Sequence, residues 1–245
     1  MVSIKNPEEI SAMREGGKIL AKIIKELAKK VRPGISTLEL NGAAEALISL
    51  SGGQCSFLGY EGYPACLCTS INEEIVHAAP SERVLKEGDI VSLDLGIFYK
   101  GFHTDMAITL SVGKVKPEIE KLIEVTKKSL EVGIKEIKPG KHLGDIGFVI
   151  QKYAESNGFN IVRDLCGHGI GREVHEEPQI LNYGKRWTGL ELKEGMVICV
   201  EPMIATGDWR IKKEGFCYKT VDNSFSAHFE HTIAVTKNGC KILTK

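Results

Sequence analysis

The sequence has no excess of charge of either sign, because its 245 residues include 32 lysines and arginines and 32 aspartates and glutamates. A balanced chain has no overall electrostatic field that would draw a phosphate backbone or an anionic membrane to its surface. We therefore expect no specific nucleic-acid binding, although a local patch is compatible with this balance. The composition also excludes disorder, since 42% of the residues are hydrophobic and 26% are charged.

Long apolar segments are also missing. No run approaches the about 18 residues that a membrane-spanning helix needs. The N-terminal segment carries Glu8 and Glu9 where a signal peptide would carry bases. We therefore expect a cytoplasmic protein that has no contact with a membrane.

The cysteines lack the spacing of a metal-binding or disulfide-rich domain. There are seven, an odd number, spread through a chain long enough to fold without cross-links. Cys66 and Cys68 form a C-x-C pair, but no second pair follows at zinc-finger spacing. The sequence therefore predicts buried or pocket thiols in a reducing compartment.

Four segments have the caps and the apolar spacing of helices. Asn6 precedes a proline and two acids, and Ser36-x-x-Glu39 is a capping box. The predicted helices begin at Asn6, Ser36, Glu118 and Leu143 and end at Arg32-Pro33-Gly34, Gly52-Gly53, Lys138-Pro139-Gly140 and Asn157-Gly158. Strands are predicted over 89–99, 104–112, 196–204, 216–221 and 230–236.

Short motifs recur in the same order in both parts of the chain, which indicates an internal repeat. The recurring motifs are R/K-P-G at 32–34 and 138–140, L-K-E-G at 85–88 and 192–195, V-H-x-x-P at 76–80 and 174–178, and H-x-D/E at 103–105 and 228–230. No linker-like tract separates the two parts. We therefore expect a single α+β domain, 1–245, with two pseudo-symmetric halves of about 1–113 and 114–245.

The repeat places acids at matching positions within apolar strand patterns. Asp94 corresponds to Glu201, and Asp105 corresponds to Glu230. A buried carboxylate needs a cation or a hydrogen-bonding partner, and four converging carboxylates would repel one another. Two divalent cations would balance their charges.

His168 is a fifth candidate ligand, because it stands prominently in the glycine-rich stretch Cys166-Gly167-His168-Gly169-Ile170-Gly171. One imidazole with four carboxylates favours manganese, iron or cobalt and permits zinc. Taken singly, each acid also fits a surface salt bridge, and the glycine-rich stretch also fits a tight turn. The set of five favours a metal centre.

The motifs around these residues resemble those of the methionine aminopeptidases over nearly the whole chain. The matching stretches are Asn72-Glu73-Glu74-Ile75-Val76-His77, Asp94 with Phe102-His103-Thr104-Asp105, Gly167-His168-Gly169-Ile170-Gly171, Val174-His175-Glu176-Glu177-Pro178, Val200-Glu201-Pro202-Met203 and Glu230-His231-Thr232. The resemblance, which is to the short type I form, implies the pita-bread fold. It also implies metal-dependent removal of the N-terminal methionine from peptides and nascent proteins that have a small second residue.

The resemblance also implies roles for individual residues. It makes Asp94, Asp105, His168, Glu201 and Glu230 the ligands of two divalent metal ions, with Asp105 and Glu230 bridging. Glu201 is the candidate general base, while His175 lies beside the developing oxyanion and His77 beside the peptide nitrogen. Either histidine could instead be structural, but their paired V-H-x-x-P settings favour the catalytic interpretation.

A methionine pocket is implied by the same resemblance. Its wall includes His77, Tyr60, Tyr63, Cys68 and Phe216, since rings and sulfur suit a thioether. Phe57 and Val174 also fall at pocket positions, where common members have cysteine and phenylalanine. These two differences affect the shape of the pocket and the tolerance for the second substrate residue.

Two other functions fit parts of the pattern. One is a prolidase-like X-Pro peptidase, although such relatives usually carry an additional N-terminal domain. The other is a non-catalytic binding module of the same fold, although all five ligand positions are intact here. We expect a monomer that acts on peptide or nascent-protein N-termini, with possible ribosome contact through the basic face at Lys22, Lys25 and Lys29.

Overall fold

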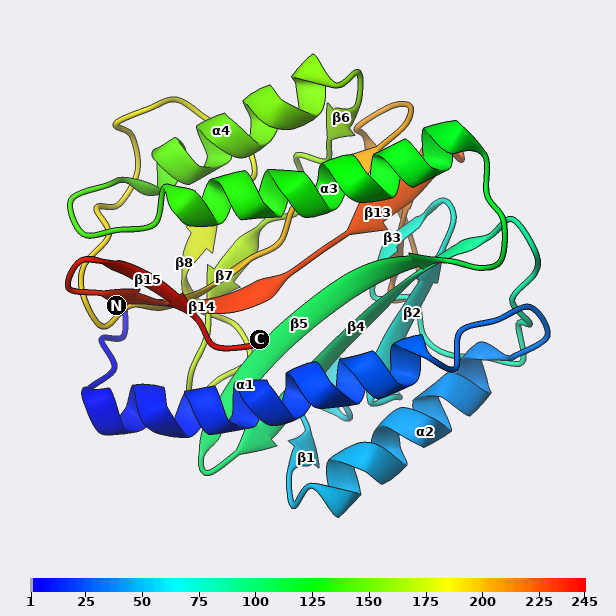
Figure 1. The fold of residues 1–245 in the computed structure, drawn as a ribbon, viewed down its shortest axis with the longest axis horizontal. Coiled ribbons are helices and arrows are strands. Elements are labelled where there is room, and N and C mark those ends of the chain that lie inside the picture. The colour runs from blue at the N-terminus through cyan, green and yellow to red at the C-terminus, as the bar shows by residue number, and fades with distance from the viewer. Residues whose placement is uncertain (1) are drawn as a thin grey trace.

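Helices and short strands alternate along residues 2–245, the part of the chain that the computed structural model describes (Figure 1). The side chains of Asn6 and Ser36 accept hydrogen bonds from the backbone N–H groups of Glu9 and Glu39, so the predicted N-cap at Asn6 and the predicted capping box at Ser36 both form. The four predicted helices are present within a few residues of their expected ends: α1 (Pro7–Ala28), α2 (Thr37–Leu50), α3 (Pro117–Lys135) and α4 (Leu143–Ser156).

The strands are more numerous and shorter than predicted. Before α3 lie β1 (Gln54–Cys55), a 3-10 turn (Tyr60–Gly62), β2 (Leu67–Ile71), β3 (Glu74–Val76), β4 (Ile90–Tyr99) and β5 (Phe102–Ser111). After α4 lie β6 (Asn160–Ile161), β7 (Gly167–Gly169), β8 (Glu176–Ile180), β9 (Val197–Val200), β10 (Met203–Ala205), β11 (Ile211–Glu214), β12 (Cys217–Thr220), β13 (Ser226–His228), β14 (His231–Thr236) and β15 (Gly239–Ile242).

The prediction of one continuous strand over 196–204 is wrong. The chain leaves the ladder at Glu201 and Pro202, so that β9 and β10 belong to different sheets. Proline has no N–H to donate, which is why it breaks a central strand. The break puts Glu201 at the end of β9 rather than inside a strand.

Two helix pairs lie on either side of the strands (Figure 1). α1 and α2 pack on one apolar cluster with β2, β4 and β5, and α3 and α4 pack on another with β9, β10, β13 and β14. Burial of these apolar side chains is the main driving force for the fold. The boundary proposed near residue 113 falls between β5 and α3, and the division into pseudo-symmetric halves remains a prediction.

Strand pairing aligns the two antiparallel sheets that carry most of the candidate site. β4 pairs with β5 along its full length and with β1 and β2 on its other edge, while the second sheet has the order β15-β14-β9-β7-β8. The Thr232 hydroxyl accepts a hydrogen bond from the N–H of Asp105 and donates one to the carbonyl of the same residue, both 2.8 Å long. This contact fixes β14 against β5.

No helix within 2–245 combines the length and the apolar character needed to cross a bilayer.

Candidate active site

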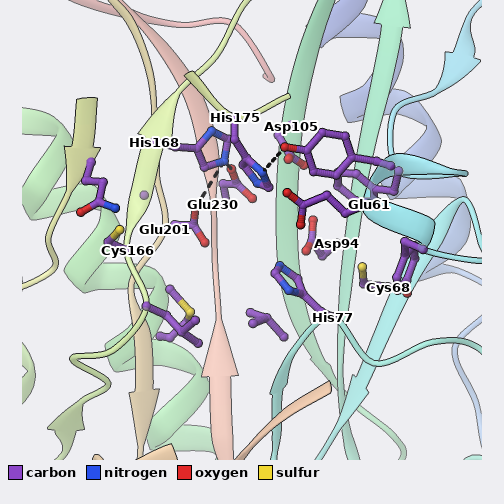
Figure 2. Close-up of a pocket in the computed structure, with 18 of the residues that line it drawn as sticks. Glu61, Cys68, His77, Asp94, Asp105, Cys166, His168, His175, Glu201 and Glu230 are labelled. Atoms are coloured by element: carbon purple, nitrogen blue, oxygen red, sulfur yellow. Dashed lines mark hydrogen bonds and ion pairs between the residues drawn. The ribbon is translucent and has the colours of Figure 1, made fainter. Parts of the chain in front are cut away.

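Four acids, three of them buried and Glu201 partly exposed, converge where the two sheets meet (Figure 2). Asp94 lies on β4, Asp105 on β5, Glu201 directly after β9 and Glu230 directly before β14. One oxygen each from Asp94, Asp105 and Glu230 lies within 4.8 Å of the others. The structure thus brings together acids that lie far apart in the sequence.

Strand alternation explains why Asp94 points away from the core. Leu93 and Leu95 pack into the apolar cluster beneath α1 and α2. Successive side chains of a strand point to opposite faces, so Asp94 faces the other side of the sheet. It is only 6% exposed there.

His168 joins the acids from β7. Its Nε2 lies 3.5 Å from Glu201 Oε1 and 3.9 Å from Glu230 Oε1. Its Nδ1 lies 2.8 Å from the carbonyl oxygen of Gly169, which can only accept, so Nδ1 carries the proton and Nε2 is left free as a ligand atom. Burial lowers the pKa of His168 to about 3, and the neighbouring His175 adds to the effect, so the ring is neutral at pH 7.

The glycines on either side of His168 permit close approach of neighbouring strands. A Cβ atom at Gly167 would lie 2.2 Å from the carbonyl oxygen of Cys199, and one at Gly169 would lie 2.2 Å from that of Glu177. Only glycine fits at both positions without movement of β7.

The electrostatics of the acids are compatible with a cation-binding site. Burial, and next the neighbouring carboxylates, raise the pKa values of Asp94, Glu201 and Glu230 well above their usual range. Burial raises the pKa of Asp105 to about 7. Asp94 Oδ1 and Glu230 Oε1 are buried without any hydrogen-bond partner among residues 2–245. Such orphaned oxygens next to an imidazole fit hard divalent cations, so the residues present suit the metal centre.

A cavity of about 460 Å³ opens beside the acids. Asp94, Asp105, His168, Glu201 and Glu230 form part of its wall. The wall also includes six of the residues that were expected to contact substrate: Phe57, Tyr60, Tyr63, Cys68, His77 and Phe216. Val174 does not line the cavity, but it packs behind the wall in one apolar cluster with Phe57, Tyr63 and Cys68.

Both candidate catalytic histidines line this cavity. His175 Nδ1 lies 3.0 Å from the Tyr60 hydroxyl, and its ring meets that of His168 edge-on at 4.4 Å between centroids. Burial lowers the pKa of His175 and lowers that of His77 to about 4. Both rings are therefore neutral at pH 7 and each has one N–H available to donate.

Comparison with known proteins decides the family. The model of metallopeptidase family M24 matches residues 11–237. The chain belongs to metallopeptidase family M24. A methionine aminopeptidase of Clostridium perfringens is 46% identical, with the alignment covering 100% of this chain and 99% of that protein.

Solved structures of M24 peptidases confirm the predicted pita-bread fold. The crystal structure of methionine aminopeptidase from Thermotoga maritima matches with a TM-score of 0.98 and 46% identity, covering 100% of both chains. The prolidase from Pyrococcus horikoshii matches with a TM-score of 0.80 and 23% identity, and this chain covers 63% of it. The second likeness concerns the fold alone, so the comparisons favour the methionine aminopeptidases over the prolidase alternative.

Sequence reasoning missed several polar residues of this M24 site. His228 is buried with its Nε2 3.5 Å from Glu201 Oε2, and the H-x-D/E repeat could have identified it. Cys199 places a thiol within 4.8 Å of ligand atoms of His168 and Glu230. Glu61 lines the cavity. Burial raises the pKa of Tyr60 and the Glu61 charge adds to this effect, whereas burial lowers the pKa of His175 and the same charge opposes it.

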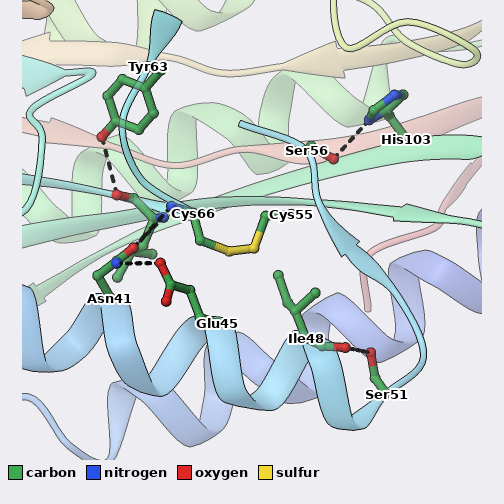
Figure 3. The surroundings of a disulfide bond; sticks show 10 residues. Asn41, Glu45, Ile48, Ser51, Cys55, Ser56, Tyr63, Cys66 and His103 are labelled. Atoms are coloured by element: carbon green, nitrogen blue, oxygen red, sulfur yellow. Dashed lines mark hydrogen bonds between the residues drawn. A yellow bond between two sulfur atoms is a disulfide. The ribbon is translucent and has the colours of Figure 1, made fainter. Parts of the chain in front are cut away.

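The prediction that Cys66 is a free thiol is wrong. Cys55 and Cys66 form a disulfide, with their Cα atoms 5.2 Å apart (Figure 3). β1 and β2 lie along the same edge of β4, which brings the two sulfur atoms together. The neighbouring Cys68 is a buried free thiol in the pocket wall, as expected.

Proposed function

We propose that this chain is a metal-dependent methionine aminopeptidase that removes the N-terminal methionine when the second residue is small. The observation that carries the proposal is that the acid cluster and an apolar, ring-lined pocket share one cavity. Rings and the Cys68 sulfur suit the thioether of methionine. The full-length relatives named methionine aminopeptidase support the same activity.

Two divalent ions, drawn from cobalt, manganese, iron and zinc, are the proposed cofactors. Asp94, Asp105, His168, Glu201 and Glu230 would hold them. When bound, such ions polarise the scissile carbonyl and make a water molecule acidic enough to act as the nucleophile near neutral pH.

The side chains of the cavity supply the rest of the reaction. Glu201 accepts the proton of the attacking water and later returns it to the leaving amine. His175 donates an N–H to the oxygen on which negative charge develops, and its hydrogen bond to Tyr60 holds the ring in place. His77 lies beside the peptide nitrogen of the scissile bond, where its unprotonated ring nitrogen can accept a hydrogen bond from the peptide N–H.

The apolar wall excludes water and positions the substrate. Phe57, Tyr63 and Cys68 are each less than 10% exposed, so a methionine side chain bound against them is withdrawn from solvent. Fixing the first residue in this way fixes the carbonyl carbon near Glu201. A bulky second residue would displace that carbon.

The proposed setting is the cytoplasm, where the chain acts as a monomer on the N-termini of peptides and nascent proteins. Lys22 and Lys25 on α1 and Lys29 directly after it are exposed, which supports a contact with ribosomal RNA or protein. Cosedimentation with ribosomes at low and high salt tests the contact, and size-exclusion chromatography tests the monomer.

The decisive experiment uses chelator-treated protein supplied with each of the four metals in turn. Met-Ala-Ser, Met-Lys-Ser and Ala-Pro-Ala peptides are then offered. We expect rapid cleavage of Met-Ala-Ser, poor cleavage of Met-Lys-Ser and none of Ala-Pro-Ala. Cleavage of Ala-Pro-Ala alone would identify a prolidase-like enzyme, and no cleavage with any metal would indicate a binding module.

A further inference from the structure

A cross-linked loop forms one wall of the methionine pocket. The Cys55–Cys66 disulfide joins the two ends of segment 56–65, which leaves the edge of β4 after Cys55 and returns to it at Leu67 (Figure 3). This segment, here called the pocket loop, carries three of the pocket residues: Phe57, Tyr60 and Tyr63. The disulfide therefore lies at the base of a structure that contacts substrate in the proposed reaction.

The two ends of the pocket loop are held unequally. β1 pairs with β4 through only Gln54 and Cys55, whereas β2 pairs with it through all of its residues, Leu67–Ile71. In addition, the Asn41 side-chain oxygen accepts hydrogen bonds from the N–H groups of both Cys66 and Leu67. The disulfide ties the weakly held end to the strongly held one.

The residues nearest the weakly held end are those that depend most on the disulfide. Tyr63 is anchored separately, because its hydroxyl lies 3.1 Å from the carbonyl oxygen of Ala78. The Phe57 ring lies so close to β4 that a Cβ atom at Gly96 would be 2.9 Å from its Cε1. Tyr60 reaches across the cavity to His175. A small movement of this end would therefore change both the pocket and the support of His175.

Contacts of Ser56 should keep the loop attached to β4, though less firmly positioned, when the disulfide is absent. Its N–H donates to the carbonyl of Gly96, and its hydroxyl lies 2.9 Å from His103 Nδ1. Loss of the disulfide should loosen the loop without unfolding the protein.

We propose that Cys55 and Cys66 are a reversible redox-modification site that sets the position of Phe57 and Tyr60, and so makes methionine recognition depend on the thiol–disulfide state. The proposal rests on the proposed methionine aminopeptidase activity. The metal ligands lie outside the pocket loop, so the cross-link acts on substrate positioning rather than on metal binding.

The oxidant is a low-molecular-weight disulfide such as oxidised glutathione. Cys55 is partly exposed and Cys66 is fully buried, so the Cys55 thiolate attacks first and releases one small thiol. The Cys66 thiolate then attacks the Cys55 sulfur of the mixed disulfide and releases the second. Two protein thiols are oxidised, one small disulfide is reduced to two thiols, and the two protons pass to these thiols.

The test compares the oxidised protein, the same protein reduced with a phosphine, and the Cys55→Ser/Cys66→Ser double variant, all loaded with the same metal. We expect kcat/KM for Met-Ala-Ser to be about tenfold lower in the reduced protein and in the double variant than in the oxidised protein, chiefly through a higher KM. A tenfold loss is less than the roughly hundredfold loss that a 1 Å misplacement can cause. The rate ratio of Met-Ala-Ser to Leu-Ala-Ser should fall as well, and metal content should stay equal. Oxidised glutathione should restore the reduced wild type but not the double variant.

Cys240→Ser is the matched control, because Cys240 is a partly buried free thiol on β15, away from the cavity. Its response to reduction should equal that of the wild type. Titration under denaturing conditions should find five free thiols in the oxidised protein, out of seven cysteines.

Two results would overturn the proposal: seven free thiols after treatment with oxidised glutathione, or equal kcat/KM and equal peptide ratios in all three forms. If no form cleaves Met-Ala-Ser, the proposed function fails. Amide hydrogen exchange then tests separately whether the disulfide positions the pocket loop. Faster exchange at 56–62 in the reduced protein supports its positioning role, and unchanged exchange contradicts it.

Discussion

Replacement of Gly167 by alanine tests whether the close approach of β7 to β9 positions His168. The new Cβ atom would lie 2.2 Å from the Cys199 carbonyl oxygen, whereas a carbon-to-oxygen contact needs about 3.3 Å. β7 must therefore move by about 1 Å. His168 is the next residue and pairs with Cys199, so it moves too.

The expected losses follow from this displacement. Overpacking of this kind costs about 1–3 kcal/mol of unfolding free energy, or a fall in melting temperature of roughly 2–12 °C for a chain of this size. A 1 Å misplacement of a ligand can lower kcat/KM about a hundredfold. Thermal melts and Met-Ala-Ser cleavage at saturating metal measure the two effects.

Gly42→Ala is the matched control. A Cβ atom at Gly42 in α2 would meet no atom within 4 Å, so alanine should leave activity unchanged and raise stability by about 0.5–1 kcal/mol. If Gly167→Ala keeps its activity within threefold of the wild type, the argument from close approach is refuted.

Three further predictions concern charge at the site. Glu201→Gln should keep the fold and lower kcat at least about a hundredfold, because an amide cannot accept the proton; metal-saturated turnover within tenfold of the wild type would contradict this. Chelation should lower the melting temperature, by an amount equivalent to about 3 kcal/mol of unfolding free energy when the metal had been present at 100 times its Kd. This difference should shrink as pH falls, because protons compete with cations for the carboxylates. An unchanged melting temperature would argue against a clustered site. Burial lowers the pKa of His77 from 6.5 in the unfolded chain to about 4, so the unfolded state binds more protons between these values and stability is lost as pH falls through this range. The substitution His77→Asn is chosen because asparagine tolerates the positive φ of 59° at this position. It should remove the contribution of His77, about 3 kcal/mol, from this part of the pH profile of unfolding free energy. An unchanged profile would count against a buried neutral ring.

Local sequence signals predicted the helices well, because their causes are local. The caps at Asn6 and Ser36 lie within one turn of the backbone groups that they satisfy. The internal repeat also predicted a non-local feature, because it related Asp94 to Glu201 and Asp105 to Glu230 without any knowledge of their contacts. The structure brings these four acids together.

Other features depend on contacts that no local pattern records. The Cys55–Cys66 disulfide follows from two strands sharing one edge of β4, and spacing along the chain gives no sign of it. His228 becomes part of the site only because β13 pairs with β10, which follows Glu201. The pocket residues were identified through family resemblance, and Val174, which falls at a pocket position, packs in one apolar cluster with three wall residues without lining the cavity itself.

The hydrogen bonds between Thr232 and Asp105 have a consequence for the order of events during protein synthesis. Asp94 and Asp105 are translated early, but Glu230 and the strand that aligns it with β5 come close to the C-terminal end. A growing chain therefore contains its first helices and the residues of the β4–β5 hairpin long before the five proposed ligands have all been translated. An unfinished chain that lacks Glu230 and β14 is short of one of the five proposed ligands, so we expect peptidase activity only after this part of the chain has been translated.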